Sequence, residues 1–337
     1  MLYHLQFFLQ LEIVFYNQHQ NGDIILSRQG VRWIVDHSPK NVNFLYIHNK
    51  HPESVFVHQK IQHVKPSMNI HCVDIDRAEH FFKQNGANPE ALWVSTWLGS
   101  IKGTRAVIDS DGRERYLLPN SNGQYIIGEC YESWDNLETQ MMLCKQSIDQ
   151  INSFFALNFV SFKIPYPEEK DLLIKWSSNP PKIDQAKELL NNDFKLRVLV
   201  CNSDTISQQR PNFVYEEFLA ETVKENSNVA FYFTDKKADL QLPNVFYVND
   251  VVSVPNLNEI EYLSAFCDVI VTSLSGPGCM IINDKVMNDP TKTLIYVCRK
   301  IIGLIYDKGE CEYIQTENYD IQNIKSIIDD TIRKKLL

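Results

Sequence analysis

The sequence predicts an α/β fold made of two Rossmann-like domains. Short apolar runs rich in β-branched residues alternate with segments of helical spacing, a pattern typical of parallel sheets built from βαβ units. The length of 337 residues fits two domains of ordinary size. The composition changes along the chain as well, because all nine histidines and all five tryptophans lie at or before Trp176.

The boundary between the two predicted domains lies near Pro165. The segments PYP (165–167) and SSNPP (177–181) carry the Pro and Ser residues expected of an interdomain connection. We therefore expect one domain over 1–165, a second over 166–320 and a closing helix over 321–337.

The first half is predicted to begin with a strand and a helix. LEIVFY is an apolar run of strand formers, and the helical spacing of Ile25, Val31 and Ile34 follows it. Strands are predicted at 11–16, 43–49, 54–59, 69–75 and 91–101, and helices at 25–37 and 137–155.

The second half repeats the alternation with more uniformly apolar strands. Strands are predicted at 195–202, 228–234, 244–250, 268–273 and 293–298, and helices at 213–226, 257–267, 279–288 and 318–337. Asn258 is expected to cap the second of these helices, because Glu261 follows it three residues later. In the last helix Ile321, Ile324, Ile328 and Ile332 are expected to face inward.

The charge and the cysteines exclude several classes of protein. With 33 basic and 42 acidic side chains the net charge is −9, which disfavours nucleic acid or an anionic membrane as partner. The eight cysteines form no C-x-x-C pair and indicate free thiols in a reducing compartment, the cytoplasm. The opening residues lack the basic region of a signal peptide, and no apolar stretch approaches the ~20 residues of a transmembrane segment.

Ligands of such sheets bind beyond the carboxyl ends of the strands, so the loops after strands are candidate sites. The first is NQHQNGD (17–23), in which Gly22 permits a tight turn and Asp23 begins a helix. Asp23 is either an N-cap or a carboxylate available as a general base.

Two further candidate loops belong to the second half. In SLSGPG (273–278), Gly276 and Gly278 allow close approach of a ligand, and Ser275 with the following helix N-terminus suits a diphosphate. In CNSDTISQQR (201–210), Arg210 offers a bidentate phosphate partner. Each loop has a plain alternative, as a strand–helix turn or as a solvated polar loop.

For the other polar and aromatic clusters, a structural role is favoured over a role in binding. His48-x-x-His51 lacks a third metal ligand, and the acidic pairs at 74/76 and 109/111 fit strand, cap or hairpin positions. Trp93 and Trp97 are expected in the core, although Trp97 near a strand end could stack on a sugar.

Two segments resemble glycosyltransferases of the GT-B type, most closely the heptosyltransferase-like enzymes of glycosyltransferase family nine. NGDIILSRQGVRWIV (21–35) is similar to the Gly-Asp segment that opens the acceptor domain of that family. LNEIEYLSAFCDVIVTSLSGPGCMII (257–282) is similar to its donor-domain block, which ends in a Ser/Thr-Gly-Pro turn.

The resemblance implies two Rossmann-like domains facing a central cleft and an inverting, metal-independent transfer from a nucleotide-diphosphate sugar. Asp23 would be the catalytic base and Asn21, Gly22, His19 and Trp97 would meet a glycan or other hydroxyl acceptor. The donor would contact Ser275, Gly276, Pro277, Gly278, Asn202, Ser203, Arg210 and Glu261. No cofactor or metal is expected.

Two other functions fit the same architecture. A sugar-nucleotide epimerase related to UDP-N-acetylglucosamine 2-epimerase shares the two domains, but such enzymes bring a His from both halves and the second half has none. A non-catalytic nucleotide-sugar-binding protein would bind the donor without transfer.

Overall fold

A computed structural model describes most of the chain, in two compact units, Met1–Leu172 and Leu173–Leu337. The boundary falls seven residues after the expected one. The described residues are 11–17, 21–48, 58–64, 88, 90–96, 105–108, 114–119, 125–126, 137–203, 213–253, 256–273, 275–297, 309–316 and 320–337. Of the helices in these ranges, none is long and apolar enough to span a membrane.

The first unit is built on a four-stranded parallel sheet in the order β3-β2-β1-β4. Its strands are β1 (Leu11–Tyr16), β2 (Val42–Ile47), β3 (Ile61–Val64) and β4 (Leu92–Ser95). Most of the strand predicted at 54–59 lies outside the described residues. His58 to Lys60 form a turn, and the pairing of β3 begins at Ile61. The strand predicted at 69–75 lies outside the described residues.

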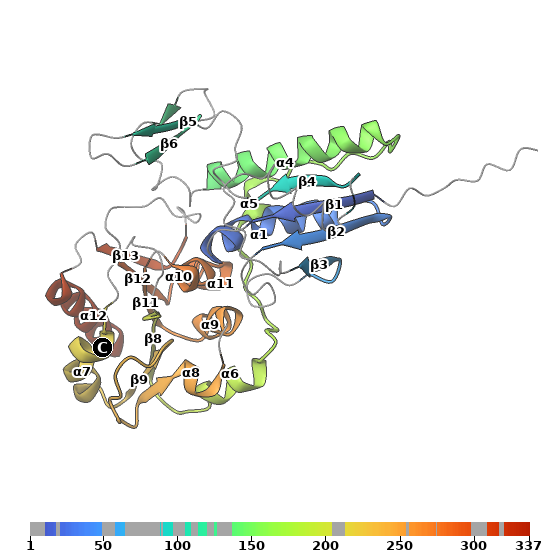
Figure 1. The fold of residues 1–337 in the computed structure, drawn as a ribbon. Helices are drawn as coiled ribbons and strands as arrows, with labels where there is room; N and C mark the ends of the chain where they lie inside the picture. Colours follow the sequence, from blue (N-terminus) through green and yellow to red (C-terminus); the bar gives the residue numbers. More distant parts are fainter. Residues whose placement is uncertain are drawn as a thin grey trace, which may run out of the picture. The chain divides into compact units, whose positions relative to one another are not determined.

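Two long helices pack against each other in this unit. They are α1 (Asn21–Asp36) and α4 (Leu137–Leu157), followed by the short α5 (Glu169–Leu172). A Cβ on Gly30 of α1 would lie 3.3 Å from the Cβ of Cys144 in α4, so the two helices approach each other closely at this glycine. Figure 1 shows α4 running beside β4.

A separate antiparallel sheet, β5-β6-β7, belongs to the first unit. Its strands are β5 (Arg105–Ile108), β6 (Glu114–Pro119) and β7 (Tyr125–Ile126). β5 pairs antiparallel with β6, and the acidic pair 109/111 between them lies outside the described residues.

The second unit holds a six-stranded parallel sheet in the order β10-β9-β8-β11-β12-β13. The strands are β8 (Leu196–Val200), β9 (Val229–Phe233), β10 (Val245–Tyr247), β11 (Val269–Ser273), β12 (Thr293–Val297) and β13 (Glu312–Thr316). β9, β11 and β12 are buried at every position, as expected of strands covered on both faces.

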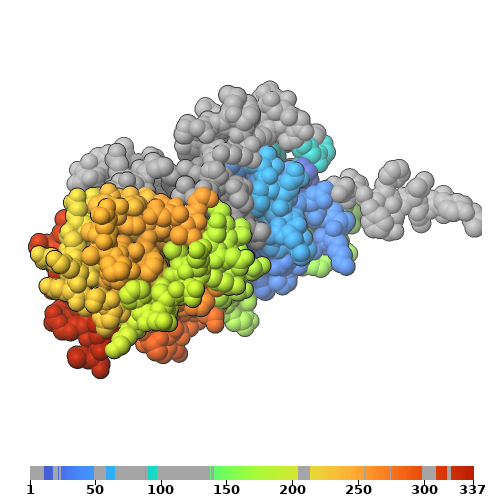
Figure 2. Space-filling view, turned by 90° about the horizontal axis from the view of Figure 1, so that it is seen from below, coloured from blue at the N-terminus to red at the C-terminus, as the bar shows by residue number. Residues whose placement is uncertain are grey.

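Seven helices accompany this sheet in the described part of the second unit. They are α6 (Ile183–Leu190), α7 (Tyr215–Glu225), α8 (Val248–Val251), α9 (Leu257–Ser264), α10 (Gly276–Ile281), α11 (Asp284–Met287) and α12 (Ile321–Leu336). The backbone N–H of Lys182, just before α6, donates to Glu259 of α9 at 3.2 Å. Figure 2 shows the α6 residues, in yellow-green, lying against the orange residues of α8 and α9.

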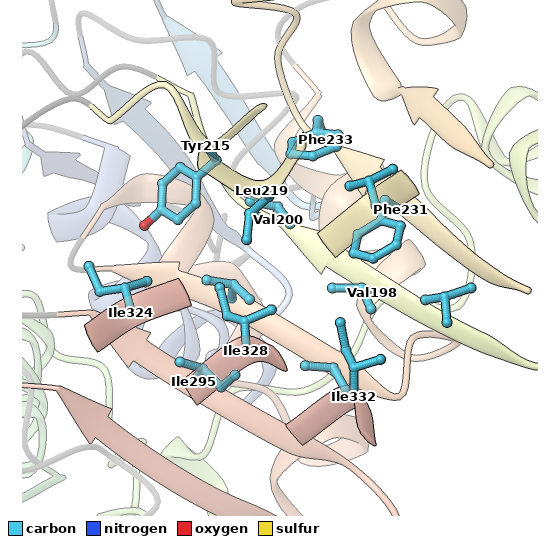
Figure 3. Close-up of a cluster of buried hydrophobic side chains, with 14 of the residues drawn as sticks. Val198, Val200, Tyr215, Leu219, Phe231, Phe233, Ile295, Ile324, Ile328 and Ile332 are labelled. Carbon is cyan, nitrogen blue, oxygen red and sulfur yellow. The ribbon is translucent and has the colours of Figure 1, made fainter. Parts of the chain in front are cut away.

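The core of the second unit lies between the sheet and α7 and α12. Ile324, Ile328 and Ile332 of α12 are buried and point toward Val198 and Ile295 of the sheet (Figure 3). Ile321 was expected on the same face, but it is 39% exposed because it is the first residue of the helix, before the turn that contacts the sheet.

Two other helix predictions need correction. α9 begins at Leu257 with Asn256 at its N-cap position, so Asn258 lies inside the first turn and is not the N-cap. The single helix predicted at 279–288 is two helices. Asn283 separates them, because its side-chain oxygen accepts from the backbone N–H groups of Lys285 and Val286 and caps α11.

Candidate functional site

The order of strands in the second sheet locates a candidate site. From β8 the chain proceeds outward through β9 to β10, and from β11 it proceeds in the opposite direction through β12 to β13. The direction therefore reverses between the neighbouring strands β8 and β11. In open parallel sheets, ligands bind outside the carboxyl ends of the strands at such a reversal. Two of the three predicted loops, 201–210 and 273–278, follow β8 and β11.

The loop after β11 is shaped by its own sequence. The Ser275 hydroxyl accepts from the backbone N–H of Gly278 at 3.2 Å and donates to the Ser273 carbonyl at 3.1 Å. Pro277 lies in the first turn of α10, where its missing N–H breaks no hydrogen bond. Ser275 and Pro277 thus serve the turn, and α10, with six residues, is too short to act alone as an anion site.

Gly278 has a packing role. A Cβ at this position would lie 2.0 Å from the Ser273 carbonyl oxygen and 3.1 Å from the Thr272 hydroxyl. The start of α10 therefore presses directly on the end of β11. Third glycines of dinucleotide-binding loops allow the same close packing of helix and strand.

Two buried hydroxyls at the end of β11 have no partner in the described part of the chain. They are those of Thr272 and Ser273, which are 0% and 1% exposed. Side chains alternate along a strand, so the two hydroxyls lie on opposite faces of the sheet. Thr272 lies beneath Gly278, which leaves Ser273 as the hydroxyl that a ligand could satisfy. A buried hydroxyl without a hydrogen bond costs about 1–3 kcal/mol.

Asn202, two residues after β8, uses its whole side-chain amide in hydrogen bonds. Its side-chain amide donates to Glu216 at 3.0 Å and to the Asp235 carbonyl at 2.8 Å. Its oxygen accepts from the Asp235 backbone N–H at 2.8 Å and from the Thr234 hydroxyl at 3.1 Å. The Ser203 hydroxyl lies 2.9 Å from that of Thr234. These bonds fix the end of β8 to the end of β9.

Asp235, two residues after β9, was not selected from the sequence. Its Oδ1 accepts from the Asn249 amide at 2.5 Å and from the Lys236 backbone N–H at 3.0 Å, and the side chain is half-buried. An acidic residue at the end of the second strand is the ribose-binding position of dinucleotide-binding sheets. The signal was present in FYFTD, where Asp235 ends a buried strand.

The remaining predicted donor residues divide between the core and the undescribed part. Glu261 is completely buried in α9, where its backbone carbonyl accepts from the Ser264 hydroxyl at 2.7 Å. Arg210 lies outside the described residues. Gly276 begins α10 and is half-buried.

Three of the predicted acceptor-side residues lie at the start of α1. Asn21, Gly22 and Asp23 form its first turn after the end of β1 at Tyr16, so the helix begins earlier than predicted and includes the end of the predicted loop. The side chains of Asn21 and Asp23 lie outside the described set, as do His19 and Trp97.

Buried polar side chains follow three neighbouring strands of the first sheet. Asn17 follows β1, His48 follows β2 and Thr96 follows β4. The Tyr46 hydroxyl lies 2.9 Å from that of Thr96, and His48 Nε2 lies 3.3 Å from Nδ1 of His63. His48 thus contacts His63, and His51 falls outside the described part. Within the described residues no group of three His, Cys, Asp or Glu could hold a metal ion.

A small cavity lies under α1 and α4. Its volume is about 20 Å³, room for about one water molecule. Its lining includes Ser27, Gly30, Thr96 and Cys144. It is too small for a sugar.

Comparison with solved structures relates this architecture to glycosyltransferases. The crystal structure of the glycosyl transferase family 9 protein from Veillonella parvula superimposes with a TM-score of 0.50 and 11% identity, over 96% of this chain and 95% of that one. E. coli heptosyltransferase WaaC with ADP gives a TM-score of 0.49 at 8% identity, over 96% of this chain and 100% of that one. E. coli ADP-heptose lps heptosyltransferase II gives 0.47 at 12%, over 97% and 100%.

The likeness to the Veillonella protein shows the fold. The chain has the two-domain α/β architecture of a GT-B glycosyltransferase, as predicted. No protein-family model matches the sequence, and no curated protein matches it.

Proposed function

We propose that this protein is a glycosyltransferase that moves a sugar from a nucleotide-diphosphate sugar to a hydroxyl group of a glycan or other acceptor. The observation that carries the proposal is the reversal point of the second sheet, where a buried Ser273 hydroxyl without a described partner ends β11 beside β8. A diphosphate oxygen placed there would accept its hydrogen bond.

The donor is assigned to the second unit. The diphosphate lies at the turn of Ser275, Gly276, Pro277 and Gly278, where Gly276 and Pro277 are only half-buried, and Arg210 adds positive charge. Ser203 lies at the neighbouring strand end. Asp235 accepts from a ribose hydroxyl through Oδ2, while Asn249 and Lys236 hold Oδ1.

Asn202 and Glu261 act on the donor indirectly. The Asn202 amide is already bonded to Glu216, Thr234 and Asp235, and Glu261 lies inside α9, so neither side chain is assigned a contact with the donor. Asn202 joins β8 to β9 and thereby positions Ser203 and Asp235.

The transfer is inverting and needs no metal. The acceptor hydroxyl oxygen attacks the anomeric carbon, Asp23 takes its proton, and the bond from that carbon to the diphosphate breaks as the nucleoside diphosphate leaves. Asn21, Gly22, His19 and Trp97 hold the acceptor. Backbone N–H groups and Arg210 stabilise the charge on the leaving diphosphate, the task that a metal performs in other transferases.

A reducing compartment, the cytoplasm, fits the thiols. The five described cysteines are all free and buried. Burial raises the pKa of Cys144 and of Cys267 to about 12, so these two are inert packing residues.

A ligand panel tests the donor proposal. Nucleoside diphosphates and nucleotide sugars that bind the folded protein raise its melting temperature, and at least one is expected to do so. Each stabilising nucleotide sugar is then incubated with and without acceptors. Transfer supports the proposal, epimerisation without an acceptor indicates an epimerase, and unchanged sugar in every mixture indicates a binding protein. No shift with any nucleotide removes the basis of all three.

Asp23→Asn tests the catalytic base. α1 begins at Asn21, so Asp23 lies in its first turn and not at the N-cap position expected from the sequence. Asn has nearly the same shape as Asp, so a purely structural role leaves kcat nearly normal. As the base, Asp23 contributes about 10²–10⁴ in rate, and the variant should bind donor normally while kcat falls at least about a hundredfold. A normal kcat would exclude Asp23 as the base.

A further inference from the structure

Exposed apolar side chains are concentrated at one end of the first unit. Seven large hydrophobic side chains are exposed among the described residues, and four of them lie between residues 157 and 166. These four are Leu157, Phe159, Phe162 and Tyr166, which we call the α4 tip. Leu157 is 78% exposed and Phe159 is 98% exposed. Such clustering differs from the scattered single hydrophobic residues of ordinary surfaces.

The backbone of the α4 tip holds a phenylalanine where glycine is usual. α4 ends in a Schellman turn, in which the Val160 N–H donates to the Phe155 carbonyl at 2.8 Å and the Phe159 N–H to that of Ala156 at 3.2 Å. This turn gives Phe159 a φ of 59°, a left-handed conformation that is costly for a bulky residue. Within its unit the ring gains almost no burial in return.

The segment after the helix is fixed to the rest of the unit. The Asn152 side chain exchanges two hydrogen bonds with the backbone of Ile164, at 2.8 and 3.1 Å. The Trp33 indole donates to the Pro165 carbonyl at 2.8 Å, and the Tyr166 hydroxyl donates to Asp149 at 2.5 Å. The exposed apolar side chains therefore belong to a turn that these hydrogen bonds hold in place.

We propose that the α4 tip inserts into the surface of a lipid bilayer made mainly of uncharged or zwitterionic lipids. Charge argues for lipid, because Lys163 is the only charged residue from Ser153 to Tyr166. Phe, Leu, Tyr and a single Lys are the residues that enter a bilayer interface, with Lys extending to the headgroups.

Insertion rather than charge attraction drives this binding. The whole chain has a net charge of −9, which opposes anionic lipids. The inference is independent of the proposed transferase activity.

Vesicle sedimentation with the full chain tests the proposal. Wild type is expected to sediment with phosphatidylcholine vesicles, and about 0.5 M salt should not release it because screening leaves apolar burial intact. Leu157→Asp and Phe159→Asp should each lower the partition coefficient about tenfold or more. Leu337→Asp is the matched control, because Leu337 is a fully exposed leucine far from the α4 tip in the sequence. This variant should sediment like wild type.

These variants keep the fold, since both side chains are exposed and Asp tolerates a left-handed backbone better than Phe. Phe159→Trp adds a direct readout, in which brominated phosphatidylcholine should quench its fluorescence more than that of wild type. The proposal is overturned if wild type does not sediment, if the tip variants sediment like wild type, or if only anionic vesicles bind. It is also overturned if the tip instead mediates a dimer that Leu157→Asp abolishes.

Discussion

Ser273 and Thr272 end the same strand with buried hydroxyls, but only one of them is placed to meet a ligand. Ser273→Ala removes the donor expected to bind the diphosphate. The diphosphate oxygen is charged, so this hydrogen bond contributes about 1.5–3 kcal/mol, and nucleoside diphosphate affinity should fall about 10- to 150-fold in isothermal titration. The melting temperature without ligand should stay the same or rise, because the lost hydroxyl has no partner in the described structure.

Thr272→Val is the matched control for this measurement. It removes a hydroxyl of the same kind that lies beneath Gly278, where a ligand does not reach. Replacing an unpartnered hydroxyl by a group of the same shape is neutral or stabilising. Equal losses of affinity in the two variants would show that Ser273 is not a specific contact.

Two glycines of α10 have different roles, because Gly278 packs against β11 whereas Gly276 is expected to face the ligand. Gly278→Ala places a Cβ 2.0 Å from a backbone oxygen of β11, so the helix must shift. Overpacking of this kind costs about 1–3 kcal/mol, which urea unfolding should detect.

Gly276→Val should instead keep the stability and lower nucleotide affinity strongly, because a β-branched side chain would occupy the space through which the diphosphate approaches. Normal affinity in a folded Gly276→Val protein would place the phosphate elsewhere.

The pairing of α12 with β13 depends on pH. Lys334 Nζ lies 2.6 Å from Glu312, and the Thr293 hydroxyl donates to the same carboxylate at 2.9 Å. These bonds, that from Lys334 first, lower the pKa of Glu312 below its ordinary value of 4.5. A depressed pKa contributes stability that is present above pH 4.5 and is lost as the pH falls through the folded value.

Glu312→Gln tests this dependence by urea unfolding across pH. The variant should be less stable than wild type at neutral pH by less than about 1 kcal/mol, because the pair is partly exposed. The difference should vanish in acid. Asp330→Asn removes an exposed helix pair with Arg333 and serves as the control, with little change at any pH. A difference that persists in acid would assign the loss to packing.

Elements were predictable from the sequence where one local rule decided them. β9, β11 and β12 are continuous apolar runs because both faces of the sheet are covered. β13 was missed because EYIQT is half-buried and polar, so no apolar run marks it. The cap of α9 was misassigned because Asn258 and Glu261 imitate a capping box, whereas both are buried by tertiary packing.

At the scale of the molecule, the positions of the candidate-site loops could be predicted from the sequence through the fold topology. The hydrogen-bond partners of the polar side chains in those loops could not be predicted. Strands alternating with helices predict which loops gather at the edge of a sheet, and 201–203 and 275–278 do follow neighbouring strands. The sequence could not show that Asn202 is fully bonded or that Ser273 is not. The hydrogen bonds of Asn202 depend on Thr234, Asp235 and Glu216, which belong to other parts of the sequence.

Division of labour between the two units gives a prediction for hydrogen exchange. If the donor binds to the second unit, a stabilising nucleoside diphosphate should slow amide exchange in peptides covering 201–203, 234–236 and 272–278, because bound ligand suppresses local opening. Peptides covering β1, in the first unit, should exchange as before. Peptides 201–203 and 272–278 lie at the ends of β8 and β11, which pair with each other. Both peptides should therefore become protected from exchange at the same nucleotide concentration. Protection confined to the first unit would reverse the assignment of donor and acceptor, since one nucleotide site cannot leave its own loops unprotected.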